Sequence, residues 1–156
     1  MTQPARNSLE TILVVEDHPV VLEAVCEILE RAGFGVLAAG SGAEAIRTEG
    51  LTEGTIHLLL SDVMMPDMSG PAVAELLKNR RPEMRVMLMS GYHDGDLLLL
   101  NYGWHFIEKP FVPAALVKKV NEVLHSPDRS QRNDQFDTRI EPKASKSVPE
   151  IGAPQI

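Results

Sequence analysis

The chain has 156 residues, 44% of them apolar and 4% aromatic, so we expect one globular domain with a mostly aliphatic core. Its net charge of −7 argues against a general affinity for nucleic acid or for anionic membranes. The single cysteine excludes an internal disulfide, and the lack of a long apolar stretch or signal-peptide pattern predicts a cytoplasmic protein.

Short aliphatic runs alternate with segments of helical periodicity along most of the chain. Pro19 in the first turn of the first helix and Gly33 just beyond its end are typical start and stop signals. In chain order, the predicted elements are strand 11–15, helix 19–32, strand 34–39, helix 42–49, strand 56–61, helix 70–80, strand 85–89, a short helix 95–102, strand 104–108 and helix 113–125.

This alternation predicts an α/β fold. Nearly continuous aliphatic strands are typical of parallel strands that are covered on both faces, so we expect a doubly wound, five-stranded parallel sheet with helices on both faces. That domain spans 11–125. Residues 1–10 are polar and predict a flexible lead, and residues 126–156 are too poor in apolar residues to order themselves, which predicts a disordered tail.

Reactive side chains stand where four of the predicted strands end. Glu16 and Asp17 follow the first strand, Asp62 the third, Ser90 the fourth and Lys109 the fifth. In a doubly wound sheet, ligands bind beyond the carboxyl ends of the strands. These residues therefore indicate a site for a metal and a phosphoryl group.

The three acids are the metal part of this hypothesis. Converging carboxylates repel one another unless a cation lies among them, and their oxygens suit Mg²⁺, whereas no His/Cys cluster offers zinc a site. Any one acid alone is better explained as a turn residue or a helix cap, and Asp17 before Pro19 would cap a helix well. All three together at strand ends favour the metal.

The lysine and the serine are the phosphoryl part. Lys109 would pair with Asp62 and then with a phosphoryl oxygen, although a solvated surface lysine is the usual alternative. Ser90 would donate a hydrogen bond to the same group, past the unobstructing Gly91, or would simply begin a Ser-Gly turn. Nucleotide-binding glycine loops are absent.

Four motifs, in order, resemble the receiver domain of two-component response regulators over roughly residues 10–125. They read Val-Val-Glu-Asp-His-Pro at 14–19, Ser-Asp-Val-Met-Met-Pro-Asp-Met-Ser-Gly at 61–70, Met-Ser-Gly-Tyr at 89–92 and Glu-Lys-Pro-Phe at 108–111. Residues 68–71 and 89–92 look most like receivers of hybrid sensor histidine kinases. The resemblance implies the flavodoxin-like strand order 2-1-3-4-5.

The resemblance also implies roles for the acids. Asp62 would accept a phosphoryl group from a phosphohistidine of a histidine kinase. Mg²⁺ would be held by Glu16, Asp17, Asp62 and the backbone carbonyl of Met64. The family more often has Asp at the position of Glu16, which would reach the metal through water.

At the other strand ends, Ser90 would swing toward the phosphoryl group and, with Gly91 and Lys109, would bind it. Phe106 would occupy the aromatic switch position, and the bond between Lys109 and Pro110 is expected to be cis.

The spacing between the last two motifs departs from the family. Only 109 − 90 = 19 positions separate Ser90 from Lys109, which shortens the predicted fourth helix. Its four leucines at 97–100 cannot all face inward, and Trp104 and Phe106 share a face of the fifth strand. We predict an apolar patch here that binds a partner or a second copy of the chain, while ordinary core packing explains the same residues equally well.

The main interpretation is a stand-alone, phosphorylation-controlled switch of a two-component system that acts by protein contacts or as a phosphorelay. It would be a regulatory domain that assists only its own phosphorylation and dephosphorylation. Its partners would be a sensor histidine kinase or phosphotransfer protein, a downstream protein and a second copy, without nucleic acid or membrane. The sequence does not identify the kinase, the stimulus or the target.

Three alternatives compete with this interpretation. The receiver fold could serve as a binding scaffold that is never phosphorylated, or the chain could be one piece of a hybrid kinase system. A phosphotransfer enzyme of another doubly wound family is disfavoured because such enzymes need a second acid two residues after their nucleophile, where this chain has Pro19 after Asp17.

Overall fold

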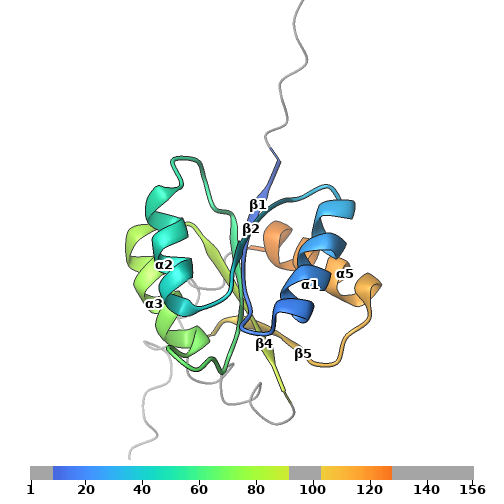
Figure 1. Cartoon of the computed structure of the whole chain (residues 1–156). Helices are drawn as coiled ribbons and strands as arrows, with labels where there is room; N and C mark the ends of the chain where they lie inside the picture. The colour runs from blue at the N-terminus through green and yellow to red at the C-terminus, as the bar shows by residue number, and fades with distance from the viewer. Residues whose placement is uncertain (1–8, 92–102, 128–156) are drawn as a thin grey trace, which may run out of the picture.

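The computed structural model describes residues 9–91 and 103–127 (Figure 1). Five parallel strands form one sheet in the order β2-β1-β3-β4-β5, which confirms the predicted topology. The strands are β1 (Thr11–Val15), β2 (Gly35–Ala39), β3 (Leu58–Asp62), β4 (Arg85–Ser90) and β5 (His105–Glu108).

Helices cover both faces of the sheet, as predicted. Helices α1 (Pro19–Arg31) and α5 (Pro113–His125) lie on one face, and α2 (Gly42–Leu51) and α3 (Gly70–Arg80) lie on the other (Figure 1). No helix in these two stretches has the length and apolar character that crossing a membrane requires.

Strand β1 shows why the aliphatic runs are continuous. Ile12 and Val14 pack against α1 and α5, whereas Leu13 and Val15 pack toward α2 and α3, and all four are fully buried. Successive side chains of a strand point to opposite faces, so a strand covered on both faces needs an apolar residue at every position. The sheet is thus one rigid layer between two cores.

Most predicted boundaries lie within two residues of the observed ones. Strand β3 starts at Leu58, later than the predicted 56, and includes Asp62 as its last residue. The predicted helix 95–102, with its four leucines, lies outside the described residues, as do residues 1–8 of the lead and 128–156 of the tail. Trp104 and Phe106 are half-buried against the α2–α3 core, so the strand half of the predicted apolar patch partly joins that core.

Candidate functional site

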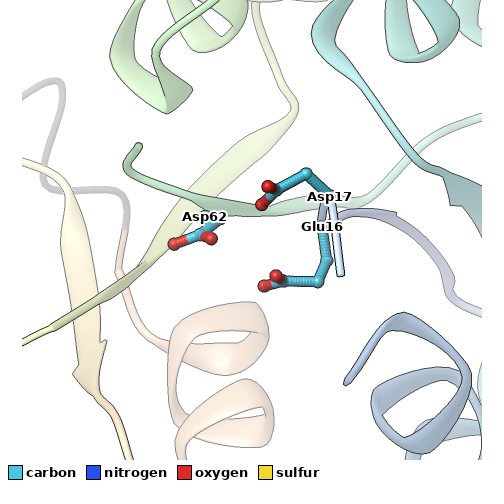
Figure 2. Close-up of side chains that lie close together, drawn as sticks. All are labelled: Glu16, Asp17 and Asp62. Carbon is cyan, nitrogen blue, oxygen red and sulfur yellow. The ribbon is translucent and has the colours of Figure 1, made fainter. Parts of the chain in front are cut away.

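Three carboxylates meet beyond the carboxyl ends of β1 and β3. Glu16 and Asp17 directly follow β1, and Asp62 ends β3. The strands are paired so that Val15 lies beside Ser61, which makes Glu16 and Asp62 neighbours. One oxygen from each acid lies within 4.8 Å of the other two, and Figure 2 shows the three carboxylates turned toward a common space. The strand topology therefore assembles the predicted acid cluster.

Lys109 bridges two of these acids. Its Nζ donates to Oε2 of Glu16 at 2.7 Å and lies 3.3 Å from Oδ2 of Asp62. Glu16 is fully buried, and its second oxygen, Oε1, accepts the backbone N–H of His18 at 3.3 Å. The sequence anticipated the pairing with Asp62 but not the closer contact with Glu16.

Charge is not balanced at this site. Three carboxylates face one ammonium group among the described residues, which leaves two negative charges when all are ionised. Burial raises the pKa of the Asp62 carboxyl, and the charges of Glu16 and Asp17 raise it further against the opposing charge of Lys109. Burial alone would lower the pKa of Lys109, but its hydrogen bond to Glu16 and the nearby acids raise it. Lys109 therefore stays protonated, and the cluster still attracts a further cation.

The helix-cap alternative for Asp17 is not observed. The N-cap residue of α1 is His18, and no side chain caps this helix among the described residues. Asp17 thus faces the other two acids without serving as a cap (Figure 2).

Ser90 has an unused hydroxyl beside this cluster. It ends β4, is 1% exposed, and its Oγ has no hydrogen-bond partner within the described parts of the chain. Its carbonyl accepts the backbone N–H of Lys109 at 2.8 Å, which ties the two residues together. An unsatisfied buried hydroxyl costs about 1–3 kcal/mol, so such a group indicates a place for a ligand atom. Gly91, next to it, is exposed.

The segment that follows Asp62 is held at its two ends. Val63 donates its N–H to the carbonyl of Met89 at 3.0 Å, and Gly70 donates to the carbonyl of Val63 at 2.8 Å. A Cβ on Gly70 would lie 2.2 Å from the carbonyl oxygen of Asp62, so only glycine lets α3 begin there. This role of Gly70 is not among the predictions from the sequence, although a glycine at the start of a helix is a signal of it.

Two other predicted residues belong to segments that adjoin the site residues along the chain. Met64, whose carbonyl was predicted to bind the metal, belongs to the segment after Asp62 and is 75% exposed. Phe106 lies in β5 and packs, half-buried, against the α2–α3 core. The peptide bond between Lys109 and Pro110 is cis, as the resemblance implied.

Comparison with known proteins places this geometry in a family. The sequence-family model of the response regulator receiver domain matches residues 12–121 of this chain. The sensor kinase CckA of Brucella abortus is 31% identical over 121 residues, which cover 76% of this chain and 13% of that protein. The chain also spans only part of other curated relatives, such as 58% of the transcriptional regulatory protein CpxR of Escherichia coli K12.

Solved structures agree with this match. A receiver domain from Clostridium thermocellum superposes with a TM-score of 0.68 at 27% identity, covering 82% of this chain and 99% of that one. The receiver domain of the hybrid histidine kinase CckA superposes with a TM-score of 0.63 at 31% identity, covering 73% and 98% respectively. The likeness to hybrid-kinase receivers noted in the motifs is thus borne out.

Proposed function

The chain belongs to the family of response regulator receiver domains, and from this premise we propose that Asp62 is its phosphoacceptor. A receiver domain is a regulatory part of a two-component system. The residue-level proposal rests on one observation: among the described residues, two uncompensated negative charges lie beside the Ser90 hydroxyl, which has no hydrogen-bond partner there. That combination suits a divalent cation and a phosphoryl group together.

In the proposed reaction, a carboxylate oxygen of Asp62 attacks the phosphorus of a phosphohistidine. The new P–O bond forms as the P–N bond breaks, and the electron pair of that bond remains on the imidazole nitrogen. The product is an aspartyl phosphate. Lys109 stabilises the charge on the phosphoryl oxygens, and the hydroxyl of Ser90 donates a hydrogen bond to one of them.

The donor set fits Mg²⁺. Glu16, Asp17, Asp62 and the carbonyl of Met64 would hold the ion, all through hard oxygen atoms. When bound, Mg²⁺ supplies positive charge that reduces the repulsion between the carboxylates and the phosphoryl group. Both oxygens of Glu16 already accept hydrogen bonds from the protein. Glu16 would keep these bonds if it contacted the ion through a water molecule instead of directly.

Phosphorylation would then be read out through Ser90 and Phe106. Movement of Ser90 toward the phosphoryl group would leave space at the end of β4, beside β5. Phe106 is half-buried in β5 and would change its packing with this movement. The proposed partners are a histidine kinase or phosphotransfer protein, a downstream protein and a second copy, in the cytoplasm.

The test is intact-mass measurement after incubation with acetyl phosphate and Mg²⁺. We expect one added phosphoryl group in the wild type and none in Asp62→Asn. Glu53→Gln changes an exposed acid far from the site and is the matched control, which should be labelled like the wild type. Equal labelling of Asp62→Asn would disprove the assignment, and failure of the wild type with acetyl phosphate and with a panel of histidine kinases would favour the binding scaffold.

A further inference from the structure

The loop between β3 and α3, residues 63–69, contacts a helix that the proposed chemistry does not use. Oδ1 of Asp67 accepts the backbone N–H of Gly42 at 3.2 Å, and Oδ2 accepts that of Ala43 at 2.9 Å. Gly42 and Ala43 are the first two residues of α2, where backbone N–H groups have no partner inside the helix. A carboxylate from one loop thus satisfies the start of a distant helix, whose dipole also favours it.

Helix α2 has its own cap as well. The hydroxyl of Ser41 accepts the N–H of Glu44 at 3.1 Å, and the carboxylate of Glu44 accepts the N–H of Gly40 at 2.8 Å. Asp67 binds the two N–H groups that this local cap leaves over. Its role is therefore to join the loop to the helix rather than to mark where the helix begins.

A second contact joins the same two segments. Gly42 is buried, and a Cβ placed on it would lie 2.8 Å from Cβ of Met68. The start of α2 and the loop therefore meet too closely for a side chain at this position. The contact does not depend on charge, so it supports the connection independently of Asp67.

The other end of α2 is fastened to the same unit. Glu49 binds Arg80 and Arg81, which belong to α3 and its C-cap. The loop lies between β3 and α3, so α2 holds this unit both at the loop and at the far end of α3. Met64 lies in this loop, and its side chain is exposed.

We propose that Asp67 is a positioning residue for phosphorylation: by fastening the β3–α3 loop to α2, it fixes the carbonyl of Met64 relative to the acids at the ends of β1 and β3. This inference rests on the proposed function. Hydrogen bonds from Ala43 and Gly42 keep the pKa of Asp67 below its ordinary value, so the link stays ionised at neutral pH. Partners that orient metal ligands are commonly worth roughly 10- to 100-fold in metal affinity or activity.

The experiment compares three variants of the full chain. Asp67→Ala removes the carboxylate link, Gly42→Ala forces the two segments apart, and Ser41→Ala removes only the local cap of α2 and is the control. We measure Mg²⁺ affinity by calorimetry, the rate of phosphorylation by acetyl phosphate, and thermal stability. Asp67→Ala and Gly42→Ala should each lose about 10-fold in both affinity and rate, whereas Ser41→Ala should lose stability but remain within about twofold in both.

Two results would overturn the proposal. One is wild-type Mg²⁺ affinity and phosphorylation rate in Asp67→Ala, and the other is losses in Ser41→Ala as large as those in Asp67→Ala. If Asp67→Ala is poorly folded, Asp67→Asn replaces it in the test, because it keeps one acceptor and the shape of the side chain. Its Mg²⁺ affinity and phosphorylation rate should then lie below those of the wild type. Mg²⁺ affinity is measured without a phosphodonor, so a failure of phosphorylation at Asp62 would be distinguishable from a failure of this inference.

Discussion

Two buried glutamates, Glu49 and Glu16, lie toward opposite ends of the sheet and show how the same type of residue serves different purposes. Glu49, at the end of α2, is 6% exposed and pairs with Arg80 at 2.9 Å and with Arg81 at 3.1 Å. Glu16 is 0% exposed and pairs with Lys109 at 2.7 Å, but that lysine is shared with Asp62. Around Glu49 cations outnumber the acid, and around Glu16 acids outnumber the cation.

The hydrogen bonds and pKa shifts around the two glutamates differ as the charges do. Arg81 also donates to the carbonyls of Thr52 and Gly54, so the hydrogen-bonding groups around Glu49 have partners. Burial opposes the ionisation of Glu49, but the hydrogen bonds and charges of its arginines hold its pKa below the ordinary value, whereas the pKa of Asp62 at the other end is raised. A saturated buried charge stabilises a fold, and an unsaturated group of charges marks a binding site.

Removal of Arg81 should have the largest effect on stability. Arg81→Ala leaves a buried carboxylate with one exposed partner and leaves two carbonyls without a donor, so we expect a loss of roughly 3 kcal/mol in the free energy of unfolding. Denaturant titration measures it, with Arg80→Ala as the milder control because Arg80 is more exposed. Below the melting temperature the phosphorylation rate should not change. A large drop in that rate would contradict the division between the two ends.

Asp17→Asn should give the opposite profile. It removes one charge from the unbalanced site, so Mg²⁺ affinity and the phosphorylation rate should each fall by roughly 10- to 100-fold, or about 1.4–2.7 kcal/mol, with stability unchanged or slightly raised. Calorimetry of Mg²⁺ binding measures the first quantity. Full phosphorylation in excess chelator would show that the cluster does not act through a metal.

Asp62→Asn should raise stability in the absence of Mg²⁺. The pKa of Asp62 lies above its ordinary value of 3.8, so the folded protein binds this proton more tightly than the unfolded chain. The ionised carboxylate therefore lowers stability as the pH rises through the pKa values of the unfolded and folded states, so the variant should be more stable than the wild type at pH 7 but not below both pKa values; denaturant titration at the two pH values measures the difference.

Glu49→Gln is the matched comparison for that pH dependence. The pKa of Glu49 is lowered from 4.5, so its charge contributes stability above the unfolded pKa that is lost as the pH falls through the folded pKa. This variant should be less stable than the wild type at neutral pH, and the difference should vanish in acid. Stability changes of the same sign in both variants would contradict the comparison.

The smallest expected effect is optical. Trp104 is the single tryptophan and lies two residues before Phe106, beside the α2–α3 core. Repacking at Phe106 on phosphorylation should shift or quench its emission, with Asp62→Asn as the silent control. Unchanged emission in a fully phosphorylated sample would exclude a switch through β5.

Periodicity and strand ends in the sequence determined the sheet and the acids at its carboxyl edge. Continuous aliphatic runs require cover on both faces, and the residue after a buried strand has to emerge at its end. Glu16, Asp17, Asp62 and Lys109 could therefore be named from their positions alone. The motifs added the family and the cis bond before Pro110. The shortened helix after Gly91 lies outside the described residues and remains a prediction.

Pairings between side chains were decided by the tertiary structure. Lys109 and Glu16 are 93 positions apart, Arg81 and Glu49 are 32, and Ala43 and Asp67 are 24. Periodicity states which face or edge a residue occupies, but it does not state which residue from another element arrives beside it. That depends on the strand order, on the approach of α2 to the β3–α3 loop, and on side chains long enough to cross the gap. Glu16 reaches Lys109 for this reason, and Glu49 becomes a structural anchor because the crossover brings two arginines to it.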